Sequence, residues 1–453
     1  MSSIRQENRS ADFIEPDWLM ITVIGAGLAG CEAALQCRRF GLLVRLYEMR
    51  PAVMTPAHKT GDVAELVCSN SLKSEEITNA HGLLKAELKV YRSFLLECAE
   101  KSRVPGGKAL VVDRKKFSLE VEGELKRSGV ELVRTEISAP PETTTIIAAG
   151  PLASPALNQF LVEFLGARQL FFYDAIAPIV SAESLNREKI FAGSRYGKGD
   201  DYLNCPLTES DYHLLVKELA HGEIYHAHDF DRVPFFEGCL PVEELARRDG
   251  LALAFGPLKP VGLIDPRTGK KPFAVVQLRR ENQAGTMYNL VGFQTRLKRS
   301  EQKRIFQLIP GLEHAEFLRY GSIHRNTFLN SPEILSPTLQ TKKRINLFIA
   351  GQLTGVEGYV ESIATGLLAG INAARLAQNG VPFIPPETTI LGALLKYITS
   401  PNRSFQPMNA NFGLIPPLDT PARGLKKRQL LAQRALTSAQ QAQQLLFARK
   451  TFV

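Results

Sequence analysis

Hydrophobic residues near the start of the chain follow the pattern of a strand, a helix and a second strand. An apolar run at residues 20–24 leads into a helical pattern, and a second apolar run covers residues 42–47. The turn between the first strand and the helix carries three glycines: Gly25, Gly27 and Gly30. Glu48 directly follows the second run. This order of strand, glycine turn, helix, strand and acid is the fingerprint of a dinucleotide-binding unit.

Each position of the fingerprint has a physical role. Gly25 permits the tight turn, and Gly27 lets the backbone approach a pyrophosphate at the helix N-terminus. Gly30 lets the helix pack closely on the strand. The Glu48 carboxylate is placed to accept hydrogen bonds from a ribose. The alternative is a tight strand-to-helix turn that binds no ligand.

The middle of the chain has a different pattern. Alternating runs between residues 172 and 300 predict antiparallel strands, with helices such as residues 209–223 between them. The strand-and-helix pattern of the N-terminal unit then returns. Residues 345–355 predict a buried strand, and residues 358–380 predict a helix. The sequence therefore predicts an α/β fold, with a Rossmann-like domain of the glutathione-reductase type interrupted by an α+β insertion domain.

The expected boundaries divide the chain into four parts. Residues 1–17 form a flexible extension, 18–165 the first part of the dinucleotide domain, and 166–315 the insertion or substrate domain. Residues 316–453 form the second part, with a basic C-terminal helix. The returning strand ends in Ala350 and Gly351 before a helix, an element with which many FAD proteins contact their flavin. It favours FAD over NAD as the resident dinucleotide, although Gln352 stands where many FAD proteins have Asp.

Composition narrows the class of protein. The chain has 453 residues, is 44% hydrophobic, and has no continuous apolar run of membrane-spanning length. The stretch at 1–17 is polar and does not resemble a signal peptide, so we expect a cytoplasmic protein with no membrane contact. The net charge of +9 favours an anionic partner such as RNA, although a basic enzyme without nucleic acid remains possible. The basic tail at residues 422–450 predicts a helix that either packs on the body or contacts RNA.

Six cysteines occur without CxxC spacing, which argues against a zinc ribbon or a disulfide framework. Cys68 lies in a polar loop, and Cys239 precedes Pro241 and a predicted helix start. A thiol near a helix N-terminus and near cations has a lowered pKa, so these two are the candidate nucleophiles. The alternative is that both are small core residues. A core position suits Cys31, Cys37 and Cys98, because each falls within an apolar helical pattern. The role of Cys205 is left undecided.

Two further groups of side chains have candidate roles. His324 and Arg325 accompany Tyr359 and Glu361 near the returning strand, where they would stack on a flavin or bind a substrate. The alternative is helix capping and surface pairing. His221, His226 and His228 are closely spaced, but no matching acid or cysteine set accompanies them, so we expect no metal site.

Several long segments occur in the order found in one known family. They include GAGLAGCEAA, ELVCSNSLKS, PGGKALVVDR, GCLPVEELARR, GSIHRNTF and AGQLTGVEGYVES. From about residue 18 to past residue 415, the chain resembles the folate- and FAD-dependent tRNA uracil-5-methyltransferases (TrmFO), which are related to GidA (MnmG).

The resemblance implies methylation of C5 of uridine 54 in the tRNA T loop. It implies 5,10-methylenetetrahydrofolate as carbon donor, and FADH2, regenerated by NADH or NADPH, as reductant. Cys239 then matches the nucleophile and Cys68 a second functional cysteine, while His324 and Arg325 are weaker candidates for substrate binding. The expected flavin contacts are Gly25, Ala26, Gly27, Leu28, Ala29, Gly30, Glu48, Gly351, Gln352, Gly355, Gly358 and Tyr359.

Two other functions fit parts of the same pattern. A GidA-like enzyme would modify the tRNA wobble uridine, but it would be longer than this chain. A non-catalytic flavin-bearing RNA-binding or redox protein would need neither cysteine. The oligomeric state is left open by the sequence.

Overall fold

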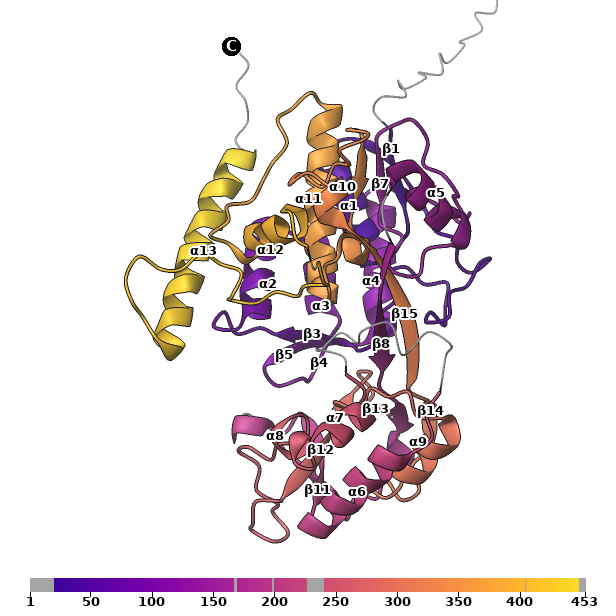
Figure 1. Cartoon of the computed structure of the whole chain (residues 1–453), viewed down its shortest axis with the longest axis vertical. Helices are drawn as coiled ribbons and strands as arrows, with labels where there is room; N and C mark the ends of the chain where they lie inside the picture. The colour runs from indigo at the N-terminus through magenta and orange to yellow at the C-terminus, as the bar shows by residue number, and fades with distance from the viewer. Residues whose placement is uncertain (1–19, 167–168, 198, 226–239, 404, 448–453) are drawn as a thin grey trace, which may run out of the picture.

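The structure is a computed structural model that describes residues 20–166, 169–197, 199–225, 240–403 and 405–447. Figure 1 shows an upper body, which contains the N-terminal and C-terminal thirds of the chain, and a lower body built from the middle third. The predicted extension at residues 1–17 lies outside the described residues. No helix among those described is long and apolar enough to cross a membrane.

A five-stranded parallel sheet forms the centre of the upper body. Its order is β16-β7-β1-β2-β6, and every neighbouring pair is parallel. The strands are β1 (Met20–Ile24), β2 (Leu43–Tyr47), β6 (Glu131–Val133), β7 (Thr145–Ile147) and β16 (Leu347–Ile349). Strand β16 comes from the C-terminal third and pairs with β7, so the first domain resumes after the insertion, as predicted.

Helices of the upper body surround this sheet. The same body also contains a second, smaller sheet. The small sheet pairs β5 (Ala109–Val112) with β3 (Ser71–Ser74) and β4 (Arg103–Val104). The helices are α1 (Leu28–Arg39), α2 (Ala80–Val90), α3 (Phe94–Lys101), α4 (Arg114–Arg127), α5 (Pro155–Leu165), α10 (Ser331–Ile334), α11 (Tyr359–Ala377), α12 (Ile390–Thr399) and α13 (Gly424–Phe447).

Helices α1 and α11 pack against each other at unusually short range. A Cβ atom at Gly366 would lie 2.2 Å from the carbonyl oxygen of Ala29, and one at Gly370 would lie 2.5 Å from that of Ala33. Only glycine fits such contacts, because real Cβ atoms do not come this close to a backbone oxygen. The two helices belong to the N-terminal and C-terminal thirds of the chain, yet the starts of both border the same cavity.

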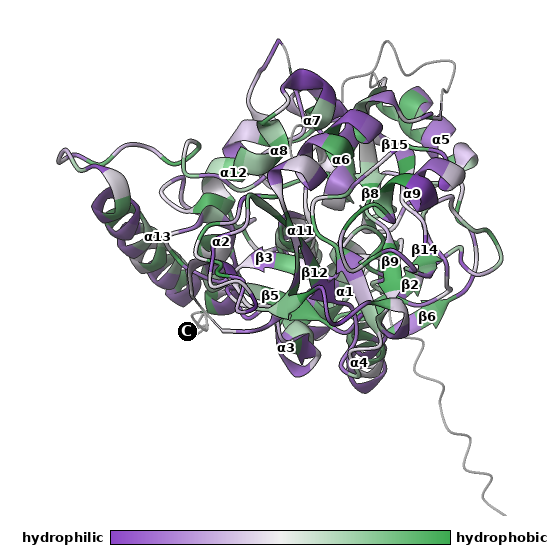
Figure 2. Ribbon diagram, turned by 90° about the horizontal axis from the view of Figure 1, so that it is seen from below, coloured by the Kyte–Doolittle hydropathy of each residue, from purple (hydrophilic) through white to green (hydrophobic). Residues whose placement is uncertain are grey.

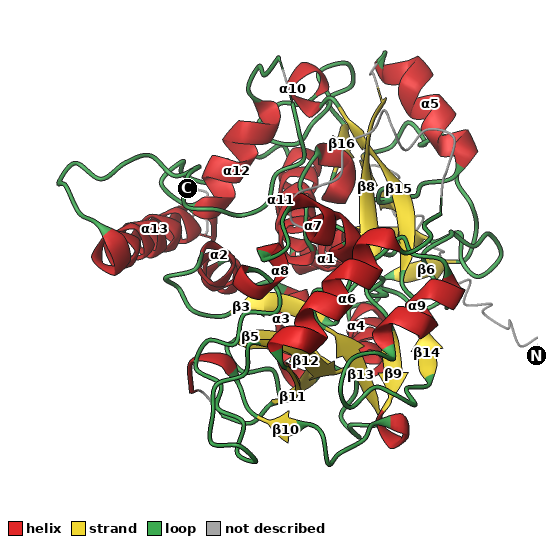
Figure 3. Ribbon diagram, turned by 60° about the horizontal axis from the view of Figure 1, so that its bottom comes forward, coloured by secondary structure: helices red, strands yellow, loops and turns green. Residues whose placement is uncertain are grey.

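The lower body is an antiparallel sheet covered by helices (Figure 3). Its strand order is β10-β11-β12-β13-β9-β14. The strands are β9 (Ile179–Ser181), β10 (Phe191–Ala192), β11 (Tyr202–Leu207), β12 (Ala274–Arg280), β13 (Met287–Leu290) and β14 (Phe317–Arg319). The helices are α6 (Glu209–His221), α7 (Val242–Arg248), α8 (Ala252–Phe255) and α9 (Arg299–Phe306), with short 3-10 turns at Ala182–Ser184 and Arg195–Gly197.

Two long strands connect the bodies. Strands β8 (Gln169–Ile176) and β15 (Ser322–Leu329) pair antiparallel along their whole length, and Figure 1 shows them running from the upper body to the lower one. The predicted fold class, a Rossmann-like domain interrupted by an α+β insertion, is confirmed. The domain boundaries at 165/166 and 315/316 stay predictions.

Four cysteines are core residues. Cys31, Cys37 and Cys98 have at most 1% of their surface exposed, as their helical patterns predict, and Cys205 is also fully buried. Burial raises the pKa of Cys37 to about 12 and that of Cys98 to about 12. Buried thiols with a raised pKa are protonated at neutral pH and suit a core position, not a nucleophile.

The contact between α1 and α11 is tested by Gly366→Ala. The added methyl group collides with the Ala29 carbonyl, so we expect the free energy of unfolding to fall by about 1–3 kcal/mol. Urea denaturation followed by circular dichroism measures this change. The matched control is Gly123→Ala in α4, where a Cβ would meet only the end of the flexible Arg127 side chain. The control should be neutral or slightly stabilising, and an equal loss in both variants would contradict the account.

Candidate dinucleotide and substrate site

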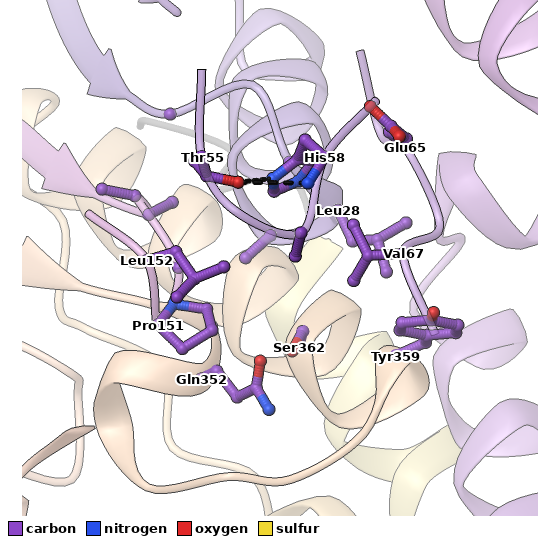
Figure 4. Close-up of a pocket in the computed structure, with 18 of the residues that line it drawn as sticks. Leu28, Thr55, His58, Glu65, Val67, Pro151, Leu152, Gln352, Tyr359 and Ser362 are labelled. Atoms are coloured by element: carbon purple, nitrogen blue, oxygen red, sulfur yellow. Dashed lines mark hydrogen bonds between the residues drawn. The ribbon is translucent and has the colours of Figure 1, made fainter. Parts of the chain in front are cut away.

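A cavity of about 380 Å³ lies where α1, α11, the Cys68 loop and β15 meet. Apolar side chains such as Leu28, Val67 and Leu152 line it together with the polar side chains of His58 and Gln352 (Figure 4). Most of the predicted site residues line it: Gly25, Gly27, Leu28, Ala29, Glu48, Cys68, His324, Gly351, Gln352, Gly358 and Tyr359.

The starts of α1 and α11 both border this cavity, and neither has a side-chain cap. Gly27 precedes α1 and Gly358 precedes α11, so no side chain accepts the first N–H groups of either helix. Five other helices of the same body are capped by side chains, from Asn79, Ser93, Asp113, Ser154 and Thr389. Unsatisfied N–H groups and the helix dipole favour an anion. The two uncapped starts therefore form a site suited to phosphate.

Three predicted contacts shape the cavity without lining it. A Cβ at Gly30 would lie 1.8 Å from the Gly25 carbonyl, so Gly30 serves the packing of helix on strand. The buried Ala26 donates its N–H to Glu48 at 3.0 Å. Gly355 ends the 3-10 turn Gly351–Thr354 and packs on the ring of Phe405.

The Glu48 carboxylate is more fully bonded than the fingerprint implies. It accepts the N–H of Ala26, and the N–H, Nε and an Nη of Arg50, at 2.9–3.1 Å. Burial would raise the pKa of Glu48, but Arg50 outweighs it and holds the pKa below its usual value. Because a carboxylate has about four acceptor positions, a ribose hydroxyl would have to replace one of these bonds.

Tyr359 connects the Cys68 loop to the start of α11. Its hydroxyl accepts the N–H of Cys68 at 2.8 Å and the N–H of Ser69 at 3.1 Å. From the other side, Arg114 donates to the carbonyl of Cys68 at 3.3 Å and to Glu281 at 2.6 Å. Glu281 follows β12 in the lower body, so the loop is held by both bodies at once. Burial raises the pKa of the Tyr359 hydroxyl, which keeps it neutral.

Arg279 brings a buried positive charge to the cavity wall. The residue is 8% exposed, and its side chain donates to the neutral oxygens of Asn70 at 3.0 Å and Ser69 at 2.8 Å. Among the described residues, no carboxylate forms an ion pair with it. A buried cation held only by neutral groups favours an anionic ligand beside it.

His324 lines the cavity, and its ring Nε2 lies 3.0 Å from the Ser322 hydroxyl. Burial and the nearby Arg319 lower its pKa to about 4, so the ring is neutral at pH 7 and suited to stacking. The backbone of Arg325 pairs with that of Tyr173, but its side chain lies outside what the structure describes. Cys239, His226 and His228 also lie outside the described residues. Within those residues, no cluster of three metal-ligating side chains is present.

Two further lining residues, His58 and Arg279, belong to no sequence motif, and a third, Lys73, stood in the quoted segment ELVCSNSLKS but not among the expected contacts. A single basic residue on a strand or in a polar loop looks the same whether it faces solvent or a ligand. Glu361 stood in a quoted segment but not among the expected contacts. Burial would raise its pKa, but a hydrogen bond from His81 and the charge of Lys73 lower it to about 2, so it is an anion.

Comparison with known proteins places these features in a family. The family model described as "Glucose inhibited division protein A" matches residues 20–380. The chain is 55% identical over 421 residues to "Methylenetetrahydrofolate--tRNA-(uracil-5-)-methyltransferase TrmFO" of Moorella thermoacetica, covering 92% of this chain and 96% of that protein. The chain belongs to the TrmFO family. The protein of the same name from Halalkalibacterium halodurans is 54% identical over 424 residues, which cover 93% of this chain and 98% of that one.

Solved structures support the fold assignment of this TrmFO family member. The Aquifex aeolicus GidA structure aligns with a TM-score of 0.67 at 15% identity, over 95% of this chain and 76% of that chain. At this identity the likeness concerns the fold alone. It agrees with the Rossmann-like domain and its insertion.

Gly27 offers a direct test of ligand binding at the glycine turn. A Cβ at Gly27 would meet no protein atom within 4 Å, and its φ of −77° suits any residue. We therefore expect Gly27→Val to fold normally but to lose the bound dinucleotide, because its side chain occupies the space of the pyrophosphate. Chromatography of nucleotides released from the purified protein measures the loss. Full retention of a dinucleotide would contradict the assignment, and unchanged thermal melting is the control for folding.

His58 makes stability depend on pH. Burial and the charge of Arg50 lower its pKa to about 4, from an ordinary value of 6.5. As pH falls from about 6.5 to about 4, the unfolded chain takes up a proton that the folded protein does not. The contribution of neutral His58 to the free energy of unfolding is therefore fully present above about pH 6.5, and it is lost as pH falls to about 4. The stability of His58→Gln should therefore fall less steeply than wild type between pH 6.5 and 4 in urea denaturation, and parallel curves would contradict the assignment.

Proposed function

We propose that this protein methylates C5 of a uridine in the T loop of tRNA, with 5,10-methylenetetrahydrofolate as carbon donor and FAD as redox cofactor. The observation that carries the proposal is the shared cavity. Cys68 lies on the wall of the same cavity as the uncapped starts of α1 and α11. A dinucleotide and a functional thiol side by side are what a flavin-dependent methyl transfer requires. The relatives named above carry the matching activity in their names.

The walls of the cavity fit FAD. Above Gly27 there is open space, and a Cβ at Gly351 would meet only the side chain of Ala29. The backbone at these two glycines would hold the pyrophosphate, with the N–H groups of α1 and α11 as donors. Leu28, Val67 and Leu152 would cover the apolar rings. The bound flavin supplies two electrons, which the reaction needs because the folate carbon arrives one hydride short of a methyl group.

Uracil C5 is a weak nucleophile until a group adds to C6. We propose that the Cys239 thiolate makes this bond and leaves again after C5 has gained the methyl group and lost its proton. Cys68 is the proposed second functional cysteine. Its loop is positioned by Tyr359 and Arg114, and Arg279 adds positive charge that would stabilise a developing uracil enolate. The uridine must leave its stack to reach the cavity.

The remaining roles complete the proposal. His324, a neutral ring on the cavity wall, would stack on the folate pterin or the flavin edge. NADH or NADPH would regenerate the reduced flavin as a visiting donor. The proposed tRNA substrate and folate donor of this protein favour the cytoplasm as the place where it acts. The GidA-like wobble-uridine function is the second candidate, and it rests on the shared fold.

The test is transfer of labelled methylene carbon from 5,10-methylenetetrahydrofolate to RNA hairpins. With NADPH present, we expect label in C5-methyluridine of a T-loop hairpin and none in an anticodon hairpin. Label at the wobble position instead would favour the GidA-like function, and label in neither would favour a protein without methyl-transfer activity.

Cys239→Ala tests the nucleophile in the same assay. We expect methylation to be abolished, since covalent activation of C6 is lost, while the flavin absorbance of the purified protein is unchanged. Cys205→Ala is the control, because that thiol is buried in the lower body and should leave turnover intact. Full activity of Cys239→Ala would show that the nucleophile is another group.

A further inference from the structure

Positive charge is concentrated at the C-terminal end of the chain. The segment at 420–453 contains seven lysines and arginines and no acidic residue, whereas the whole chain has a net charge of +9. Most of the net charge therefore comes from this one segment. Over the rest of the chain, basic and acidic residues are nearly equal in number.

Helix α13 carries the described part of this segment. One face of the helix packs on the body and contacts α2. That face consists of small and apolar side chains: Leu431, Ala432, Ala435, Ala439, Ala442 and Leu446. The first turn stands on the outer side of the molecule, at the lower end of α13 in Figure 1. Figure 2 shows hydrophilic residues along much of the helix.

Four cations surround the first turn of α13: Arg423, Lys426, Lys427 and Arg428. All four are exposed, and none forms an ion pair with a described residue. Their position is unfavourable for the helix, because cations at an N-terminus face the positive end of the dipole and also repel one another. Each cation placed at a helix N-terminus costs about 0.3–1 kcal/mol of helix stability. Other cations at the surface, such as Arg103 and Arg304, are paired with carboxylates.

We propose that the first turn of α13, defined by Lys426, Lys427 and Arg428 and called here the basic turn, binds the phosphate backbone of the duplex stem that carries the target loop. This inference rests on the proposed function and names the surface that holds the RNA. A cluster of cations that form no ion pairs with described residues complements a polyanion. The contact is with phosphates, so it positions the RNA without reading its sequence.

The position of α13 suits a stem more than the loop itself. Helix α2 contacts α13, and its second residue, His81, bonds to Glu361 on the cavity wall at 3.1 Å. Helix α2, which has 11 residues, therefore links the packed face of α13 to the wall of the cavity. A membrane surface is a poorer partner, because the apolar face that would enter lipid is buried against the body.

The experiment measures the affinity of the full-length protein for two RNA hairpins with the same T loop and stems of five or twelve base pairs. For Lys426→Gln/Lys427→Gln/Arg428→Gln, we expect at least a tenfold rise in Kd for the long hairpin. The slope of log K against log salt should become shallower by about 2 to 3, for three lost phosphate contacts. The short hairpin should lose much less affinity, and its turnover at saturation should be unchanged.

The matched control removes three exposed cations of the lower body, with Lys217→Gln/Lys270→Gln/Lys303→Gln. Its Kd for the long hairpin should stay within about twofold of wild type. Unchanged affinity of the basic-turn variant for the long hairpin would overturn the proposal, as would an equal loss for both hairpins. Weakened sedimentation with phosphatidylserine vesicles, with RNA affinity unchanged, would assign the turn to membranes instead. If the wild type methylates neither hairpin but the Kd changes appear, the proposed function fails and the RNA surface stands.

Discussion

The close contact between α1 and α11 is the constraint on which the site depends. Glycines of α11 lie against Ala29 and Ala33 of α1 at a distance that no larger residue permits. This contact joins two segments that are far apart in the chain and places their N-termini at one cavity. Since neither start has a side-chain cap, the unsatisfied N–H groups of both are available to one anionic ligand. Packing within the core thus determines the electrostatics of the site.

A second set of contacts places the thiol relative to that ligand site. Tyr359 begins α11 and holds the Cys68 loop through two backbone N–H groups. Arg114 holds the same loop from α4 and reaches Glu281 of the insertion domain. The loop therefore depends on the position of both bodies. Through Glu281, the insertion domain therefore contributes to the position of the loop that carries the proposed Cys68 thiol.

The sequence predicted most of the fold because the relevant signals are local. The glycine turn, the apolar runs at residues 20–24 and 345–355, and the helix at residues 358–380 each follow from short-range periodicity. It also identified the cavity residues that belong to motifs, including Cys68 and Tyr359.

The features that the sequence did not predict depend on contacts between distant segments. The four bonds of Glu48, the neutral shell of Arg279 and the depressed pKa of His58 come from tertiary packing, which no local pattern encodes. The basic tail was left between two interpretations for the same reason. The structure shows that its small apolar face packs on the body, while the cations of its first turn are exposed. Packing on the body is therefore confirmed for one face of the helix, and RNA contact by the exposed first turn stays a proposal.

The central claim is that one dinucleotide spans the starts of α1 and α11 beside the Cys68 loop. A crystal structure of the purified protein with its bound flavin tests it most directly. The account predicts pyrophosphate oxygens within hydrogen-bonding distance of the N–H groups that follow Gly27, and the flavin ring next to Tyr359 and Cys68. A flavin bound elsewhere, or a pyrophosphate that contacts neither helix start, would contradict it.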